Sequence, residues 1–209
     1  MKKIFLTLRV ALALIAVSSA APAAFAEGLT QDEREKAVAY LEQTGDEFVK
    51  AISSISDAQW SFKPTPERWS IAECAEHITV SEDTVWQAVA EKLMKSPAAP
   101  ERKSEVAGED DIILKVIPDR STKVKAPEML VPTRRWPSRA ELIKHFNERR
   151  AKEIAYVRET SDDLRSHFAD HPFLKTLDGY QWLMLNGAHC KRHTAQIEEV
   201  KTDPGYPKS

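Results

Sequence analysis

Three segments of the sequence begin with a hydroxyl residue that is followed three positions later by glutamate, at Thr30, Ser70 and Ser138. In such a capping box, the two side chains satisfy backbone N–H groups that are left free at the start of a helix. Each box is followed by helical periodicity, and after the first one apolar residues recur at alternating spacings of three and four. A fourth helix is predicted from about Asp178 to about Lys201, where turn-forming residues flank another periodic stretch. The pattern therefore constrains the chain to a mainly helical fold.

A long connection, residues 96–137, separates the second predicted helix from the third. Six prolines exclude a helix over most of it: Pro97, Pro100, Pro118, Pro127, Pro132 and Pro137. Its one apolar run, residues 112–114, predicts either a short strand or a pad that packs on the bundle. We see no alternating segments that would build a sheet. The economical fold is all-α, a four-helix bundle whose long crossover lets the second and third helices run parallel.

The amino terminus has the pattern of an export signal. Lys2, Lys3 and Arg9 precede an uncharged run that closes on the small-x-small sequence Ala24-Phe25-Ala26. We therefore expect a signal peptide at 1–26 and a mature domain at 27–209, located in the periplasm or outside the cell. Because the uncharged run is short for a membrane span, we expect no membrane attachment after cleavage.

The charge balance excludes several classes of partner. All 32 acidic residues but only 27 of the 30 basic ones lie in 27–209, which gives that domain a formal charge of −5. Nucleic acid is therefore not an expected partner, because binding it requires clustered Lys and Arg. The chain also has no glycine-rich loop to cradle phosphates, which disfavours nucleotide chemistry. Cys74 and Cys190 leave a disulfide open in an oxidising compartment, with a thiolate nucleophile or a fourth metal ligand as alternatives.

Three histidines are placed to converge. His189 and His193 lie four residues apart on the fourth helix, so both imidazoles project from one face about one turn apart. His77 lies beside the inward stripe of the second helix. Three neutral imidazoles with one open position are typical of a catalytic metal centre. Histidines that are merely satisfied in the core are the alternative, and the remaining three are predicted to be solvated: His145, His167 and His171.

Three further residues are candidates for catalytic roles. Glu153 and Arg149 fall on the inward stripe of the third helix, where they either form an i,i+4 ion pair or line a substrate pocket. Gln196 lies one turn past His193 and is placed to orient an imidazole or a bound ligand. Glu153 is the candidate base, with Glu73 as an alternative.

Several segments resemble the DinB-like family of metal-binding four-helix bundles. The resemblance rests on Trp69–His77 at the start of the second helix and on His189–Ile197 in the fourth. It extends to Asp178–Trp182 and to the connection with Lys-Ala-Pro-Glu at 125–128 and Trp-Pro-Ser at 136–138. Together these segments account for nearly all of residues 30–207.

The resemblance implies an up-down-down-up bundle in which His77, His189 and His193 bind a divalent metal, commonly zinc or nickel. It also implies a homodimer. Characterised members include transferases and isomerases that use low-molecular-weight thiols, and metal-dependent hydrolases. The leader and the long connection depart from the typical cytoplasmic member. An oxidising compartment argues against a reduced thiol as cosubstrate.

These observations support one leading hypothesis and two alternatives. The first is an exported metal-dependent enzyme of the hydrolase type, in which the ion activates water or a thiol for attack on a small-molecule substrate. The second is a thiol S-transferase. The third is a non-catalytic metal-binding or stress-response module.

Overall fold

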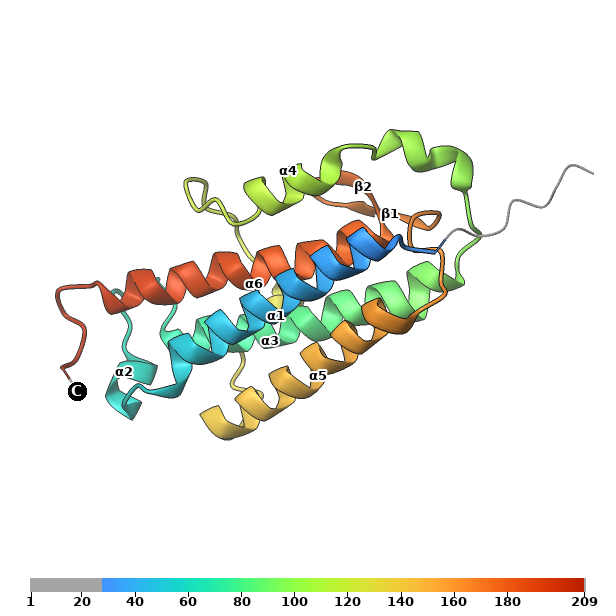
Figure 1. Cartoon of the computed structure of the whole chain (residues 1–209). Helices are drawn as coiled ribbons and strands as arrows, with labels where there is room; N and C mark the ends of the chain where they lie inside the picture. Colours follow the sequence, from blue (N-terminus) through green and yellow to red (C-terminus); the bar gives the residue numbers. More distant parts are fainter. Residues whose placement is uncertain (1–27, 209) are drawn as a thin grey trace, which may run out of the picture.

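Four long helices run side by side through the computed structural model, which describes residues 28–208 (Figure 1). They are α1 (Gln31–Ser53), α3 (Ile71–Trp86), α5 (Arg139–Glu159) and α6 (Gly179–Lys201). The expected signal peptide at 1–26 lies outside the described residues. Within them, no helix combines the length and the apolar character that a membrane span needs.

The directions of the four helices follow from contacts between their ends. The Tyr180 hydroxyl, at the start of α6, donates to the Glu33 carbonyl at the start of α1, so these two helices run parallel. The Trp86 and Tyr156 rings meet at the ends of α3 and α5, which are also parallel. Arg34, near the start of α1, donates to a carbonyl in the last turns of α5, so the two pairs are antiparallel. The predicted up-down-down-up bundle is confirmed.

Side-chain caps begin the bundle helices where the sequence places them. Thr30 and Ser70 form reciprocal capping boxes with the glutamate three residues later. Ser138 accepts the expected backbone bond at the start of α5, but its glutamate does not return one. Asp178 and Gln181 form a further reciprocal box on α6. Each box fixes the first turn of its helix and therefore the phase of the residues that follow.

The segments that connect the bundle helices are partly helical. The short helix α2 (Asp57–Ser61) joins α1 to α3. After α3 the chain continues into a π-helical segment, Gln87–Lys92, and a 3-10 turn, Leu93–Lys95. Two further 3-10 helices follow in the crossover, Pro100–Glu105 and Glu128–Leu130.

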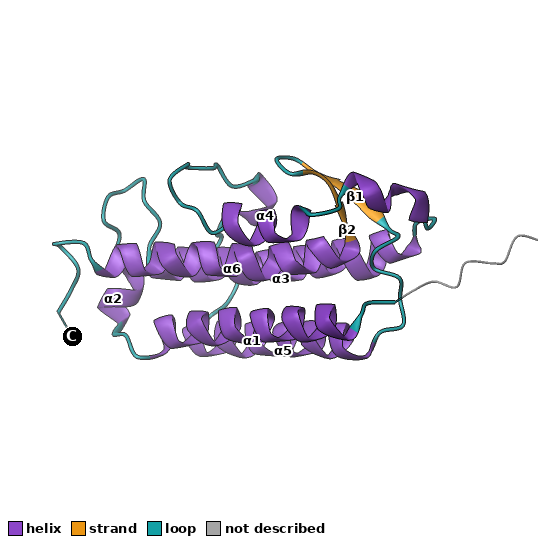
Figure 2. Ribbon diagram, turned by 45° about the horizontal axis from the view of Figure 1, so that its top comes forward, coloured by secondary structure: helices purple, strands orange, loops and turns teal. Residues whose placement is uncertain are grey.

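The apolar run of the crossover forms a helix. Residues 112–114 lie in α4 (Glu109–Val116), whose first turn carries three acidic residues that the helix dipole favours. Ile113 is buried against Leu185 and Ala188 of α6. The strand alternative for this run is wrong, and the pad alternative is confirmed. In Figure 2, α4 lies on the outer side of α6, away from α1 and α5.

A small sheet, which we did not expect, precedes α6. β1 (Phe168–His171) and β2 (Lys175–Asp178) pair antiparallel, with Phe168 opposite Asp178. The expectation of no sheet was wrong because each strand has only four residues, too few to show a clear alternation. Lys175 turns the hairpin with a positive φ of 60°.

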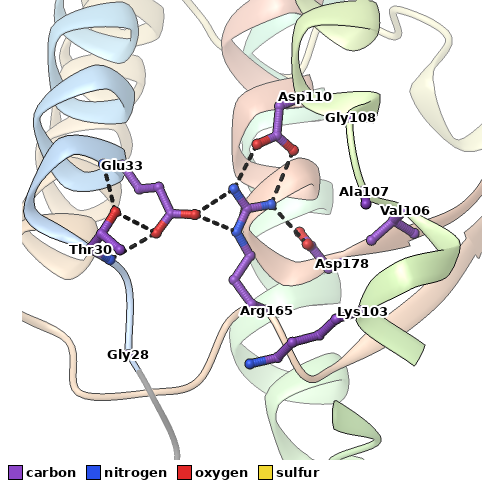
Figure 3. A pocket seen from close by; sticks show the side chains of 10 residues that line it. All are labelled: Gly28, Thr30, Glu33, Lys103, Val106, Ala107, Gly108, Asp110, Arg165 and Asp178. Atoms are coloured by element: carbon purple, nitrogen blue, oxygen red, sulfur yellow. Dashed lines mark hydrogen bonds and ion pairs between the residues drawn. The ribbon is translucent and has the colours of Figure 1, made fainter. Parts of the chain in front are cut away.

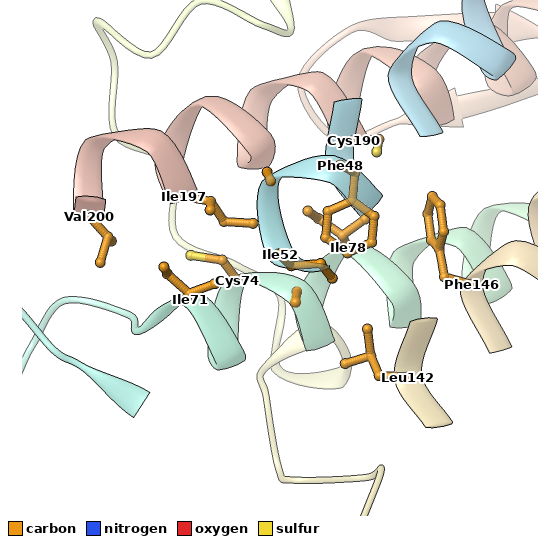
Figure 4. Close-up of a cluster of buried hydrophobic side chains, with 12 residues drawn as sticks. Phe48, Ile52, Ile71, Cys74, Ile78, Leu142, Phe146, Cys190, Ile197 and Val200 are labelled. Carbon is orange, nitrogen blue, oxygen red and sulfur yellow. The ribbon is translucent and has the colours of Figure 1, made fainter. Parts of the chain in front are cut away.

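All four bundle helices contribute to the apolar core (Figure 4). Phe48 of α1 and Phe146 of α5 pack edge to face with ring centroids 4.6 Å apart. Ile78 of α3 and Ile197 of α6 pack against the same cluster. This core holds α3 and α6 in register, and it therefore fixes the relative positions of the side chains that point away from it.

A close helix approach occurs at Gly187 of α6. A Cβ at this position would lie 2.9 Å from two carbons of the Tyr40 ring on α1. We expect Gly187→Ala to lower the free energy of unfolding by about 1–3 kcal/mol, because the ring must shift within a packed interface. Urea denaturation at neutral pH measures this loss.

Gly45 of α1 is the matched control. A Cβ there would lie 3.5 Å from the nearest atom, a carbon of Arg150, which is ordinary contact distance. Gly45→Ala should leave stability unchanged or raise it by up to about 1 kcal/mol through helix propensity. Equal losses in the two variants would contradict the close approach at Gly187.

Candidate metal centre

The structure brings His77, His189 and His193 together. His77 lies in the second turn of α3, and His189 and His193 lie one turn apart on α6. One ring nitrogen from each histidine can be chosen so that all three nitrogens lie within 4.8 Å of one another. The ring centroids are 4.4–4.9 Å apart. Antiparallel packing of α3 against α6 therefore produces the convergence that the spacing predicts.

Hydrogen bonds assign the protons of two of the three rings. His77 Nδ1 lies 2.8 Å from the Leu130 carbonyl oxygen, which can only accept, so Nδ1 carries a proton and Nε2 a lone pair. His193 Nδ1 lies 2.8 Å from Gln196 Oε1. His77 Nε2 faces His189 Nε2 at 3.1 Å. With the Nδ1 protons of His77 and His193 turned outward, their Nε2 lone pairs are free for a cation beside His189, so this donor set suits a divalent metal.

The surroundings keep the imidazoles neutral. Burial lowers the pKa of His77, although its bond to Leu130 opposes this shift. Burial and the charge of His193 lower the pKa of His189 well below its usual value. Burial, followed by the charge of His77, lowers the pKa of His193 to about 3. At neutral pH all three rings are therefore in the form that binds a metal.

The crossover and a tryptophan enclose the trio. The Trp69 ring centroid lies 4.8 Å from that of His77 and 6.2 Å from that of His193. Leu130, the partner of His77 Nδ1, belongs to the crossover. The crossover is anchored by Glu76 of α3, whose buried carboxylate accepts three consecutive backbone N–H groups, from residues 133–135, at 2.7–3.1 Å. Neither Leu130 nor Glu76 was predicted. For Glu76, the one available signal in the sequence was its position directly before His77.

Gln196 contacts a histidine one turn before it on α6. Its Oε1 accepts from His193 Nδ1 and also from Arg120 Nη1, at 3.3 Å. Arg120 belongs to the crossover. Its guanidinium also donates two hydrogen bonds to the Glu199 carboxylate, from Nε at 2.6 Å and from Nη2 at 2.8 Å. Sequence reasoning missed Arg120, because nothing in the chain order pairs residue 120 with α6.

Glu153 lies in a different part of the bundle. Its side chain is fully buried and accepts bonds of 3.0 and 3.2 Å from Asn186 Nδ2. It also lies 3.8 Å from Arg150, whose guanidinium binds Glu82 of α3. Among the described residues, no hydrogen bond joins Glu153 to the three histidines. Its role as a base stays a prediction.

Arg149 does not pair with Glu153, so the ion pair considered for them is not formed. Arg149 donates to Asp83 of α3 at 2.9 Å, and its guanidinium lies over the Trp86 ring. The physical reason is the phase of α5, whose buried positions after Phe146 are Arg150 and Glu153. A substrate-binding role for Arg149 stays a prediction.

The buried carboxyl of Glu153 should make stability depend on pH. Burial, together with the charge of Glu82, raises its pKa from 4.5 to about 8. Between these values the folded protein holds a proton that the unfolded chain has released, so stability falls as pH rises. Relative to Glu153→Gln, the wild type should lose up to about 1.4 kcal/mol per pH unit across this window. Denaturation curves from pH 5 to pH 9 measure the difference. A constant difference would contradict a proton on Glu153.

The two cysteines are free and buried, so the disulfide left open by the sequence is not formed. Cys190 Sγ points to the Thr44 carbonyl of α1, whereas Cys74 lies on α3. Burial raises the pKa of Cys190 to about 12 and also raises that of Cys74. Neither thiol belongs to the cluster of possible metal ligands among the described residues. A thiolate nucleophile is therefore disfavoured.

The other three histidines lie outside the trio. His145 contacts Asp83 at 2.7 Å. His167 faces the Ser96 hydroxyl at 3.4 Å. His171 lies in β1, where it is half-buried rather than fully solvated, and its Nδ1 accepts two backbone N–H groups of the hairpin turn. None belongs to the cluster of possible ligands among the described residues.

A cavity of about 320 Å³ lies at the opposite end of α6 (Figure 3). Arg165 fills its centre and pairs with Glu33, Asp110 and Asp178 at 2.6–2.9 Å. Asp178 precedes α6 by one residue, so His193 lies about 20 Å further along the helix axis. The charges of this cavity already satisfy one another, and they tie the hairpin to α1 and α4.

The chain is 26% identical, over 72% of its length and 88% of the relative, to the uncharacterized protein YuaE of Bacillus subtilis. It is similar in structure to YfiT from Bacillus subtilis, with a TM-score of 0.53 and 13% identity over 87% of this chain and 93% of that one. YfiT is described as a probable metal-dependent hydrolase with an unusual four-helix bundle topology. The model of the DinB superfamily matches residues 40–197, and the chain belongs to this family.

Proposed function

We propose that this protein is a metal-dependent enzyme of the hydrolase type, in which His77, His189 and His193 hold a divalent ion. The observation that carries the proposal is the number and state of the ligands. Among the described residues the cluster contains three neutral imidazoles and no fourth His, Cys, Asp or Glu. Structural zinc sites usually have four protein ligands, whereas catalytic sites keep one position open for water or substrate.

The chain's own residues prepare this site in two ways. Leu130 and Gln196 hold the Nδ1 protons of His77 and His193, which directs both Nε2 lone pairs inward. The Trp69 ring covers one side of the trio. An ion bound there would supply a Lewis acid and lower the pKa of a bound water toward neutrality.

The proposal does not depend on a carboxylate base. With its pKa raised to about 8, Glu153 holds a proton at neutral pH. Glu73, the alternative base, is engaged by the cap of α3 and by Lys63 at 2.9 Å. Activation of the nucleophile would therefore be supplied by an ion that His77, His189 and His193 hold. The described likeness to YfiT, a probable metal-dependent hydrolase, supports this choice.

A substrate panel tests the proposal. Residues 27–209, loaded with zinc or nickel, should turn over small activated esters, amides or lactones in water, without a thiol. Turnover should fall to the uncatalysed rate after chelation and in a His189→Ala/His193→Ala variant. His145→Ala is the matched control and should keep full activity, because His145 lies outside the trio.

The same panel separates the alternatives. Turnover that appears only when a low-molecular-weight thiol is added would replace the hydrolase with an S-transferase. A metal-loaded protein that turns over nothing in either condition would favour a non-catalytic metal-binding module. Neither result is expected.

We also propose that the protein acts in the periplasm or outside the cell, which the leader pattern at 1–26 supports. Fractionation of cells that express the full chain should place the shortened protein outside the cytoplasm. Recovery of the uncleaved chain in the cytoplasm would contradict this location.

A further inference from the structure

The Gln196 side chain faces both His193 and Arg120. Of these two neighbours, only the histidine can act either as a hydrogen-bond donor or as an acceptor. Gln196 Oε1 lies 2.8 Å from His193 Nδ1 and 3.3 Å from Arg120 Nη1. A histidine ring nitrogen either donates or accepts, so it does not by itself decide which end of an amide faces it. A guanidinium has donors only. Arg120 therefore selects the oxygen of Gln196 for the position between them.

This selection determines which nitrogen of His193 carries the proton. With Oε1 turned toward the ring, Nδ1 must donate, and Nε2 is left with the lone pair. If the amide turned over, its NH₂ group would face Nδ1 and favour the opposite tautomer. That tautomer carries its proton on Nε2, the nitrogen that a metal needs.

The guanidinium is held in place for this task. Glu199, one turn further along α6, binds Arg120 Nε and Nη2 at 2.6 and 2.8 Å. This carboxylate also balances the positive charge of Arg120, which would otherwise oppose a cation at the trio. The same stretch of the crossover also contacts α6 through Arg192, which donates to the carbonyls of Ile117, Asp119 and Thr122, separately from the bonds of Arg120 to Gln196 and Glu199.

We propose that Arg120 is a positioning residue of the metal centre, which fixes the amide of Gln196 and thereby the metal-binding tautomer of His193. This inference rests on the proposed metal site. Arg120 belongs to the crossover and lies 76 positions before its partner Gln196. Outer partners of metal-bound histidines contribute about 10- to 100-fold to metal affinity.

A double-mutant cycle tests the coupling. Arg120→Met should weaken zinc binding by about three- to tenfold in competition with a chelator, the loss expected when between a third and a tenth of His193 keeps the metal-binding tautomer. Gln196→Glu should remove the dependence of zinc affinity on Arg120. Both oxygens of a carboxylate accept hydrogen bonds, so rotating the group by 180° still presents an acceptor to His193 Nδ1. In the Gln196→Glu background, Arg120→Met should therefore change zinc affinity by no more than about twofold. Equal losses in the two backgrounds would overturn the inference.

Arg192→Met is the matched control. It removes contacts between α6 and the same stretch of the crossover but leaves Gln196 and Arg120 untouched. It should change zinc affinity far less than Arg120→Met does. An equal loss in both variants would show that Arg120 acts only by holding the crossover.

The tautomer itself can be read without metal. Long-range ¹H–¹⁵N spectra of the metal-free protein should show His193 protonated at Nδ1, and Arg120→Met should give a mixture of both tautomers. This measurement separates the inference from the proposed function. If the wild type binds no zinc but Arg120→Met still changes the His193 tautomer, the proposed metal-dependent function is wrong, whereas the control of the tautomer by Arg120 stands. Zinc binding with no change in tautomer or affinity would do the reverse.

Discussion

Replacing Arg150 by methionine should lower the free energy of unfolding by about 3–5 kcal/mol, because it leaves a buried carboxylate without its partner. Arg150 is 4% exposed. Its guanidinium binds Glu82 twice, donates to Thr44 Oγ1 at 2.9 Å and donates to the Leu41 carbonyl at 2.6 Å. This one side chain therefore joins α5 to α3 and α1. Methionine fills similar volume but satisfies none of these groups.

The neighbouring residue supplies the control for this prediction. Arg149 is also paired with a carboxylate, Asp83, but both side chains reach solvent, at 20% and 27% exposure. Arg149→Met should cost no more than about 1 kcal/mol. Guanidinium denaturation of both variants at pH 7 compares the two losses. A cost for Arg150→Met as small as that for Arg149→Met would contradict the buried ion pair.

Adding Glu82→Gln to Arg150→Met should recover part of the loss. The double variant removes the charge that Arg150 balances, so the remaining polar group is neutral and cheaper to bury. If the double variant is less stable than Arg150→Met alone, the loss does not arise from an unpaired carboxylate. This comparison distinguishes charge from packing.

Zinc should stabilise the protein against unfolding. A ligand that binds only the folded state raises the free energy of unfolding by about 2.7 kcal/mol at a free concentration of one hundred times its Kd. The convergence of the trio requires α3 and α6 to be packed together, so the unfolded chain does not offer this site. Denaturation curves with buffered zinc and with chelator measure the shift.

Two variants locate the source of that stabilisation. In His189→Ala/His193→Ala the shift should vanish, since one imidazole remains. In His145→Ala, which leaves the trio intact, the full shift should persist. A shift of equal size in all three proteins would mean that zinc binds elsewhere.

The sequence is sufficient to predict the architecture because the relevant signals are local. Thr30, Ser70 and Ser138 cap their helices where the sequence places them. The two histidines of α6 share a face because a helix fixes the relation of residues four apart. The proline-rich crossover explains why α3 and α5 run parallel.

The features that were missed depend on contacts across the chain or on small differences in helix phase. Arg120 lies near α6 because α4, which precedes it in the chain, packs on that helix. No spacing rule pairs Arg120 with Gln196. On α5, adjacent arginines differ by about 100° around the axis, and the structure turns Arg150 inward where Arg149 was expected. Glu153 lies on the inward stripe as expected but in a separate cluster, because its partner Asn186 faces α5.

The most direct test of the central claim is the metal content and ligand set of purified residues 27–209. The account predicts one divalent ion per chain, with X-ray absorption at the metal edge showing three imidazole ligands and one further light atom. His189→Ala/His193→Ala should lose the ion, and His145→Ala should keep it. A wild-type protein that binds no divalent ion, or a double variant that keeps its ion with unchanged absorption, would contradict the three-histidine site.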